Sequence, residues 1–552
     1  MTLLDLETNF RRSPSSDGVV QTQGRRNPDV PRRRWESLAV FAVFTGLYVW
    51  IGEWLVQGAH VVSFVTLDQL NRTLMIWHNS PPKLSAVGFN YPPLSTLLMS
   101  PLTIVAPWAR SLVIVPLVSA PFAAYLMVSV NTLMRRVAVP GLLRAGVLVG
   151  LGCNPLFAFY ASDGASDLVA LSLTVAAVSC LLTWYLTADI RFVLLSGLTF
   201  AVAGLAGYQS LVWFAVSFVG VSVVLSRNGA REEEIEGTSV GLAAPAVYAL
   251  ALWVGFSLLL THRPFGWIPR FPSDGISFGA TVTDTGRLVL DGAPLAIVVL
   301  PALVVVGLAR RDSLALWCAA LVAGAIIAPG ASSLLHLTAS PLAMRDALPI
   351  LLFAIVGALW LARSLAGSRL TVVGLLIVAL VASVPWTYSQ MRTFPRQNLE
   401  SAFTSALSSG ASQEGSRTKN GEVVGIDTEK AMAGWIRAHV HGVDQILTDN
   451  AQTYAVMLLT GDPGLFLDRV DKSDGPWMRV ADAPAHTVRY LLLSRHNTQD
   501  LLTQTYPAAA NGTDPSLPVA FADARYTLVR VPADYVRPVT GTPDQTTSGG
   551  TR

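Results

Sequence analysis

Acidic residues beside predicted membrane segments are the first candidates for chemistry in this sequence. Asp68 lies in a long polar stretch, Asp163 and Asp167 bracket a short loop, and Glu53 ends the first apolar run. Charged groups near hydrocarbon are costly unless they are solvated or used. A carboxylate can take a proton from a hydroxyl group, so all four residues are candidates for a general base.

Each of these carboxylates also has an ordinary structural explanation. Asp167 would begin a helix, where an acidic side chain caps N–H groups and favours the helix dipole. Asp68 and Asp163 could be solvated loop residues, and Glu53 could reach water from the interface. The same oxygen atoms could hold Mg²⁺ or Mn²⁺, or act without a metal, so the sequence leaves metal use open.

Basic residues on the same side could bind an anionic leaving group, because a departing phosphate needs cations or helix N-termini. Arg345 is the clearest candidate. It starts the segment Arg345-Asp346-Ala347-Leu348-Pro349 at the outer end of a predicted helix, against the cytoplasmic bias of arginine. The other outer-loop candidates are Arg72, Lys83, Arg263, Arg270, Arg287 and His336.

The composition places these residues in a membrane protein. The chain has 552 residues, of which 52% are hydrophobic and 14% charged, against about 25% charged in a typical soluble domain. Long apolar runs recur from Trp35 to Tyr388. This pattern excludes a disordered chain and argues against an ordinary soluble enzyme. The net charge of +3 is too small to indicate a nucleic-acid partner.

The N-terminal region sets the orientation. Residues 1–34 are rich in Arg, Ser and Pro, which predicts a disordered cytoplasmic tail. The first apolar run is too long for the hydrophobic region of a signal peptide, and no small-residue cleavage site follows it. We therefore predict a retained anchor in the cytoplasmic membrane, with the N-terminus in the cytoplasm.

The segment Tyr91–Pro107 decides the rest of the topology. Its four prolines would break a spanning helix, so it is predicted to form one or two helices on the outer surface, within a large external loop at 58–109. The arginine-marked short loops then all fall inside. The predicted fold class is a polytopic α-helical membrane protein with about eleven transmembrane helices within 35–388. They are expected at about 35–55, 111–133, 145–160, 168–188, 192–207, 211–226, 239–260, 288–308, 313–329, 345–363 and 370–386.

The C-terminal quarter has a different composition. Charged residues and glycines increase, and apolar runs shorten to strand length. Val443–Thr448 and Val488–Ser494 are predicted strands, and Ala451–Leu459 is a predicted capped helix. We predict a linker at 389–424, a small extracytoplasmic α/β domain at 425–533 and a disordered tail at 534–552.

The ordered set of motifs resembles the membrane glycosyltransferases of the GT-C superfamily, especially the branch with protein O-mannosyltransferases and the bacterial aminoarabinose transferase of lipid A. Tyr91-Pro92-Pro93-Leu94 is similar to a Pro-Pro motif that opens a juxtamembrane helix in that branch. Asp68 corresponds to its first-loop acid, Asp163 or Asp167 to its second-loop Asp, and Arg345 with Pro349 to its late segment. The likeness covers roughly 35–390 in layout. The chain departs from the pattern in two places: no Asp-Glu pair follows the first helix, and Asp346 stands where the family usually has Tyr.

The resemblance implies an enzyme that transfers a sugar from a polyprenyl-phosphate donor to a glycan, lipid or protein acceptor on the outer face of the membrane. Mannosyl and arabinofuranosyl transfer are both compatible. Asp68 ranks first as the general base. The donor phosphate is expected near Arg345, His336, Arg263, Arg270, Tyr91 and Asn90. The absence of a nucleotide-binding motif fits a lipid-linked donor. The alternatives are a transporter or flippase of a lipid-linked glycan, although the sequence shows no symmetric halves, and a non-catalytic scaffold for envelope assembly.

Overall fold

The computed structural model describes residues 34–87, 92–261, 278–337, 342–395, 399–418, 421, 423–470, 474–495 and 500–537. Four predicted donor-site residues lie outside these ranges: Asn90, Tyr91, Arg263 and Arg270. The predicted tails at 1–34 and 534–552 also lie almost wholly outside them.

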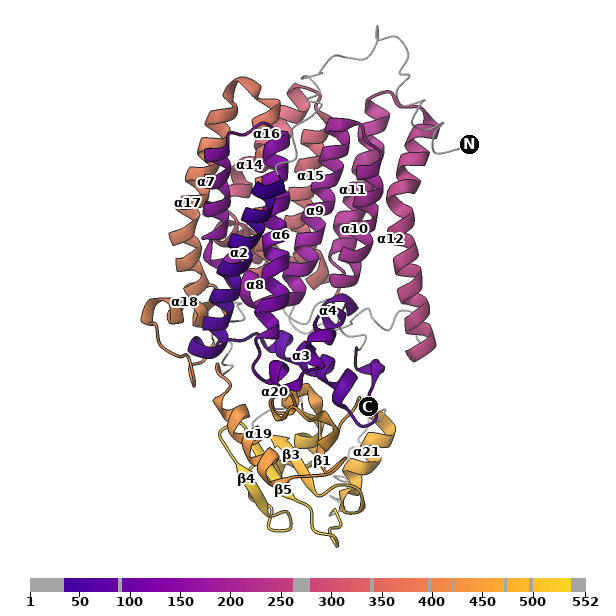
Figure 1. Ribbon diagram of the computed structural model, residues 1–552, viewed down its shortest axis with the longest axis vertical. Helices are drawn as coiled ribbons and strands as arrows, with labels where there is room; N and C mark the ends of the chain where they lie inside the picture. The colour runs from indigo at the N-terminus through magenta and orange to yellow at the C-terminus, as the bar shows by residue number, and fades with distance from the viewer. Residues whose placement is uncertain are drawn as a thin grey trace, which may run out of the picture.

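The chain forms a long helical bundle with a smaller α/β domain at one end, and the first helix of the bundle starts at the other end (Figure 1). The bundle is built from long apolar segments, as the hydropathy pattern predicts. Its helices are α2 (Arg34–Trp54), α6 (Ile114–Arg136), α7 (Gly141–Gly152), α8 (Pro155–Asp163), α9 (Ala165–Thr187), α10 (Arg191–Ala206), α11 (Ser210–Arg227), α12 (Glu232–Thr261), α13 (Phe278–Gly292), α14 (Leu295–Ala309), α15 (Ser313–Leu334), α16 (Ala347–Ser364) and α17 (Arg369–Thr393).

The membrane-spanning class is confirmed, with a lower count of spans than expected. Among the described residues, eight helices are long and apolar enough to cross a membrane, or ten if each of two bent pairs is one span. The predicted spans at 145–160 and 288–308 are the bent pairs, α7 with α8 at 72° and α13 with α14 at 100°. The predicted span at 192–207 corresponds to α10, which is only 16 residues long.

The bend between α7 and α8 has a local cause. The side chain of Asn154 accepts hydrogen bonds from the backbone N–H groups of Leu156 and Phe157, at 3.1 and 3.2 Å. Pro155 follows directly and has no N–H to continue the first helix. A helix therefore ends and a new one begins inside the bundle, which the apolar run at 145–160 does not indicate.

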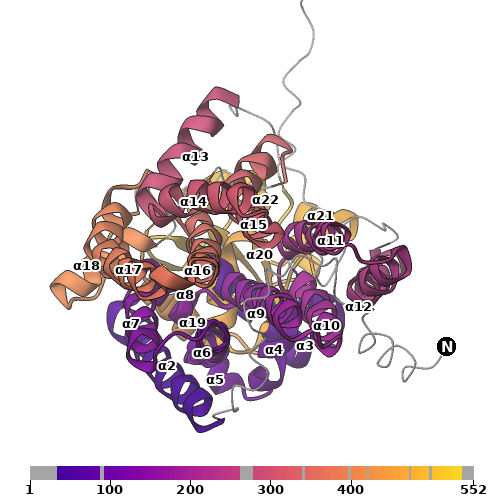
Figure 2. The ribbon, with the colours of Figure 1, turned by 90° about the horizontal axis from the view of Figure 1, so that it is seen from above.

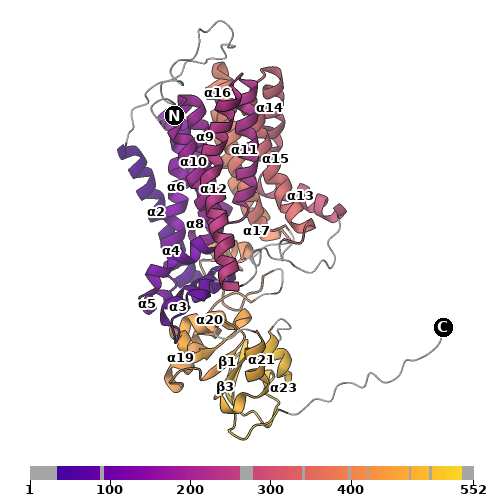
Figure 3. The same ribbon diagram turned by 90° about the vertical axis from the view of Figure 1, so that its right-hand side faces the viewer.

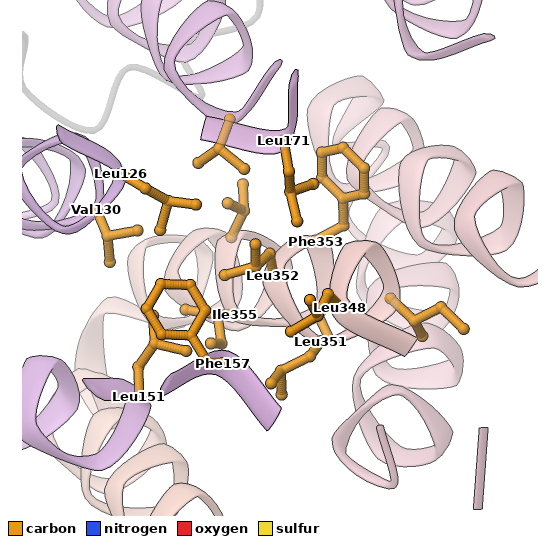
Figure 4. Packing of buried hydrophobic residues seen from close by; sticks show 14 of the residues in the cluster. Leu126, Val130, Leu151, Phe157, Leu171, Leu348, Leu351, Leu352, Phe353 and Ile355 are labelled. Carbon is orange, nitrogen blue, oxygen red and sulfur yellow. The ribbon is translucent and has the colours of Figure 1, made fainter. Parts of the chain in front are cut away.

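Helix α16 is the centre of the bundle (Figure 2). Its side chains are buried on all faces from Ala347 to Ala362 except at Pro349. Figure 4 shows side chains of α16 meeting those of α6, α7, α8 and α9. The α16 side chains labelled there are Leu348, Leu351, Leu352, Phe353 and Ile355. In lipid, close packing of side chains holds helices together, because burying apolar surface away from the lipid tails contributes little free energy. The residues at the start of α16 are therefore firmly positioned.

Short helices form a layer between the bundle and the α/β domain (Figures 1 and 3). They are α3 (Phe64–His78), η2 (Leu84–Val87), α4 (Pro93–Thr103) and α5 (Ala106–Arg110). The prediction of one or two helices at 91–107 agrees with α4 and with the start of α5. Pro93 begins α4, where a proline loses no hydrogen bond. Helix α3 was not predicted.

The C-terminal domain contains a five-stranded sheet in the order β2-β1-β3-β5-β4. Strand β1 is parallel to β2 and β3, whereas β5 is antiparallel to β3 and β4. The two predicted strands and the capped helix are confirmed by β1, β3 and α20. The elements are α19 (Asp427–His439), β1 (Ile446–Thr448), α20 (Asn450–Thr460), β2 (Phe466–Leu467), α21 (Asp474–Asp482), β3 (Tyr490–Ser494), α22 (Leu501–Thr505), α23 (Pro507–Ala510), β4 (Val519–Ala522) and β5 (Tyr526–Arg530).

The domain shares hydrophobic contacts with the membrane part. Met75 and Ile76 of α3 belong to the same buried cluster as Met432, Ile436 and Val456 of the domain. The segment predicted as a linker contains a further helix, α18 (Glu400–Ser409). The Phe403 ring of α18 packs 5.1 Å from the Phe159 ring, between their centroids. The domain is thus fixed to the bundle through α3 and follows a packed helix in the chain.

Candidate active site

Arg345 is the best-positioned cation near the α/β domain end of the bundle. It lies in a short 3-10 turn that leads into α16. Its Nη1 atom is 3.5 Å from a carboxylate oxygen of Asp167, and its Nε atom is 3.9 Å from a carboxylate oxygen of Asp346. The Arg345 side chain is 31% exposed, so the guanidinium group is held between two acids and still reaches the surface.

The two acids beside Arg345 differ in their environment. Asp167 stands in the first turn of α9, and 47% of its side chain is exposed. Asp346 is more enclosed, and it accepts a hydrogen bond of 2.9 Å from the backbone N–H of Ala343. Asp346 therefore fixes the start of α16, whereas Asp167 faces the surface beside the arginine.

A buried hydrogen bond lies on the inner side of this cluster. The hydroxyl group of Tyr160 donates to Glu400 at 2.8 Å, and Glu400 is completely buried. Glu400, Asp167 and Arg345 all lie close enough to Tyr160 to interact with it electrostatically. Sequence reasoning missed Glu400, which is a single acid in a polar segment without a motif.

Asp163 occupies a different environment from Asp167. It ends α8 and is only 2% exposed. One carboxylate oxygen accepts a 2.8 Å hydrogen bond from the backbone N–H of Ser63, while the other is buried without a hydrogen-bond partner in the described part of the chain. The hydroxyl group of Thr66 donates to the Asp163 carbonyl at 3.0 Å. Asp163 thus connects the second loop to the start of α3.

The turn between Asp163 and Asp167 needs a glycine. A Cβ atom at Gly164 would lie 2.8 Å from the carbonyl oxygen of Tyr160, closer than real Cβ contacts. Gly164 therefore lets α8 stop and α9 start within one residue. This close turn places Tyr160, Asp163 and Asp167 at one end of the bundle.

Asp68 lies on α3 rather than in an open loop. It is 8% exposed, and a carboxylate oxygen accepts a hydrogen bond from Arg72 Nε at 3.1 Å. The spacing of four residues on a helix explains this pair. Thr66, two residues earlier on α3, bonds to Asp163. In the described part of the chain, the acidic partners of Arg345 are Asp167 and Asp346, and not Asp68. The structure therefore brings Asp167 to Arg345, and it pairs Asp68 with Arg72.

The remaining predicted residues lie on other elements of the chain. His336 follows α15 in a left-handed conformation with φ of 56°. Arg287 is ion-paired with Asp291 at 3.2 Å on α13. Lys83 precedes η2, and Glu53 is exposed in the last turn of α2.

The described residues include one group with metal-ligand geometry, and it is separate from Arg345. His60, Glu414 and Asp427 each offer a ligand atom within 4.8 Å of the others. His60 Nδ1 is 2.8 Å from Glu414, whose same oxygen also accepts the N–H groups of Ile426 and Asp427. Hydrogen bonding within the protein thus accounts for this group.

The groups around Arg345 are suited to a reaction in which a phosphate is the leaving group and a proton is accepted beside it. A guanidinium group binds phosphate oxygens through paired donors. A partly exposed carboxylate beside it can accept a proton. Fold and site together describe a multi-span membrane protein with a polar cluster at the start of its central helix α16.

Comparison with solved structures identifies this fold. ArnT from Cupriavidus metallidurans, solved bound to undecaprenyl phosphate, is similar to this chain with a TM-score of 0.53 and 14% sequence identity, over 92% of this chain and 100% of that chain. The chain therefore shares the fold of that protein, as the resemblance seen in the sequence predicts.

Two other solved proteins are less similar. An oligosaccharyltransferase from Archaeoglobus fulgidus has a TM-score of 0.48 and 10% identity, over 84% of this chain and 70% of that chain. The arabinofuranosyltransferase AftD from mycobacteria has a TM-score of 0.45 and 15% identity, over 92% of this chain and 40% of that chain. No protein-family model and no curated protein matches the sequence.

Proposed function

We propose that this protein transfers a sugar from a polyprenyl-phosphate-sugar donor to a hydroxyl group of a glycan, lipid or protein acceptor. The observation that carries the proposal is the Arg345–Asp167 pair, in which the two atoms lie 3.5 Å apart at the start of the central helix. The ArnT fold supports it, because that protein was solved with undecaprenyl phosphate bound.

The reaction is assigned to the outer face of the cytoplasmic membrane. Arg135 and Arg136 end α6, and Arg310 and Arg311 follow α14. These arginines lie at helix ends opposite the α/β domain, which is the cytoplasmic position by the positive-inside rule. The α/β domain and the Arg345 cluster are then extracytoplasmic.

Arg345 is assigned to the donor phosphate. A guanidinium group has five N–H donors. The carboxylates at 3.5 and 3.9 Å use only some of them, so the other donors can bind phosphate oxygens. Its position at the end of a fully packed helix fixes the donor head at the membrane surface, while the polyprenyl tail stays in lipid.

The geometry favours Asp167 as the general base over Asp68 and Asp163. A base must reach the acceptor hydroxyl within about 3 Å. Asp167 is 47% exposed and lies beside Arg345. By contrast, Asp163 is only 2% exposed and Asp68 only 8% exposed.

The proposed step is a single displacement. The acceptor oxygen attacks the anomeric carbon and passes its proton to the Asp167 carboxylate. The bond between the anomeric carbon and the phosphate oxygen breaks, and polyprenyl phosphate leaves with its new negative charge beside Arg345. The products are the glycosylated acceptor and free polyprenyl phosphate.

The test uses purified full-length protein in detergent with synthetic polyprenyl-phosphate sugars, and cell-envelope glycans, lipids and proteins as acceptors. We expect sugar transfer by the wild-type protein and its loss in Asp167→Asn. In liposomes, movement of the lipid-linked sugar across the bilayer without transfer would instead identify a transporter. Binding to envelope components with neither activity would identify a scaffold.

A further inference from the structure

A groove runs along the side of the bundle at the end opposite the α/β domain. A cavity of about 530 Å³ is lined by residues of α2, α6 and α10, including Arg34, Arg135 and Arg136. A second cavity, of about 470 Å³, lies against α2, α6, α9 and α10. Phe41 and Tyr125 line both cavities, so the two adjoin. Helices α2 and α6 lie side by side there (Figures 1 and 2).

Three arginines gather at the mouth of the groove. Arg34, Arg135 and Arg136 line the first cavity, and Arg135 is only 9% exposed. The Arg136 guanidinium lies 5.2 Å from the centre of the Phe192 ring, a cation–π distance that holds the charge at the mouth. The acid at this end of α2, Glu36, accepts hydrogen bonds from Arg144 at 2.8 Å and Asn131 at 3.0 Å.

The rest of the groove is apolar. The second cavity is lined by Phe41, Pro121, Phe122, Leu173, Leu198 and Val202, together with Tyr125 and Thr199. Pro121 and Arg135 are 14 positions apart on α6, which corresponds to about 21 Å of helix. One leaflet of a bilayer, with its headgroup region included, is about 20–22 Å deep. The groove therefore matches one acyl chain in one leaflet, and a polyprenyl tail would extend beyond it.

We propose that this groove binds an acidic glycerophospholipid of the cytoplasmic leaflet. The lipid phosphate lies against Arg34, Arg135 and Arg136, and one acyl chain follows the groove past Tyr125. Basic pockets between membrane helices on the cytoplasmic side are suited to anionic headgroups. The site lies at the opposite membrane surface from Arg345, so it goes beyond the proposed transfer reaction.

The test is native mass spectrometry of the full-length protein, titrated with phosphatidylglycerol or with phosphatidylcholine of the same acyl chains. We expect one phosphatidylglycerol molecule to bind saturably to each protein, and phosphatidylcholine to bind with at least tenfold lower affinity. The double variant Arg135→Gln/Arg136→Gln should lower the affinity for phosphatidylglycerol about 30-fold, because each basic residue near an anionic headgroup raises the affinity by a factor of roughly five. The matched control is Arg227→Gln/Arg231→Gln, which removes two exposed arginines, the last residue of α11 and the residue before α12, and should leave phosphatidylglycerol binding unchanged.

A second variant separates a lipid site from a simple anion site. Tyr125→Trp enlarges a side chain in the middle of the groove without changing its charge, so it should lower the affinity for phosphatidylglycerol severalfold. This variant tests the proposal even if the double arginine variant fails to fold. Equal binding of the two lipids, or unchanged binding in Tyr125→Trp, would overturn the proposal. Displacement of phosphatidylglycerol by inorganic phosphate would reveal an anion site without a lipid tail. Preferential binding of polyprenyl phosphate would show that the chosen occupant is wrong.

Discussion

Replacing Arg345 with glutamine should weaken binding of polyprenyl phosphate by about 10- to 150-fold. A hydrogen bond to a charged group contributes about 1.5–3 kcal/mol, and each 1.4 kcal/mol is tenfold in affinity. The two acids beside Arg345 add to the loss. Asp167 and Asp346 lie 3.5 and 3.9 Å from the guanidinium, and in the variant they would face the phosphate without their counter-ion.

The assay is the affinity of purified protein for polyprenyl phosphate in detergent at several salt concentrations. Arg345→Lys keeps the charge and loses the paired donors, so it should lie between wild type and Arg345→Gln. Arg287→Gln is the control, because Arg287 is also ion-paired, to Asp291 at 3.2 Å, and is 49% exposed. Thermal unfolding should be similar for all variants. If Arg345→Gln binds within threefold of wild type, or if Arg287→Gln loses as much, the phosphate assignment is wrong.

Three further predictions concern stability and topology. Tyr160→Phe removes a 2.8 Å hydrogen bond to the buried Glu400 and should cost about 1.5–3 kcal/mol in unfolding free energy; if this cost is the same in a Glu400→Ala background, which lacks the acceptor, the two side chains are not coupled. Burial raises the pKa of Asp500 to about 6, above about 3.9 in the unfolded chain, so the folded state binds the proton more tightly and stability falls by up to about 3 kcal/mol as pH rises from 4 to 7. Asp500→Asn should therefore slow hydrogen exchange around α22 at pH 7 relative to wild type, and equal exchange at pH 7 would contradict this. In a background without native cysteines, Ser85→Cys should react with an impermeant thiol reagent from outside and Ala230→Cys should not; labelling of Ala230→Cys would invert the topology.

The sequence was most informative about the membrane part, because lipid imposes strict rules. The apolar runs predicted most of the spanning helices, and the prolines of Tyr91–Pro107 predicted separate short helices in the region of α4 and α5. Hydropathy does not reveal a break in a helix whose freed backbone groups find hydrogen-bond partners inside the bundle. The turn at Asn154 and Pro155 replaces its lost hydrogen bonds with a side chain, so no hydropathy pattern marks it.

The candidate site was only partly predictable. Arg345 stood out because an outer arginine at a helix end is unusual, and Asp167 stood out through its loop. Their contact joins residues 178 positions apart, which no spacing in the chain shows. Asp68 illustrates the opposite case, because its partner Arg72 is four positions away and the pair could have been predicted once α3 was recognised as a helix. The mixed polar and apolar residues of α3 resemble a loop until the domain that packs on them is known.

The central claim is that Asp167 takes the acceptor proton beside Arg345. The most direct measurement is turnover with a synthetic polyprenyl-phosphate sugar, compared side by side for the wild type and the asparagine variants of Asp167, Asp163 and Asp68. Asparagine keeps the size of the side chain but cannot take the proton, and no helix cap is lost, because the structure shows no side-chain cap at the start of α9 among the described residues. We predict a loss of about 10²–10⁴-fold in turnover for Asp167→Asn without loss of donor affinity, and a smaller effect for Asp68→Asn. Near wild-type turnover in Asp167→Asn, together with loss in Asp68→Asn or Asp163→Asn, would contradict the account.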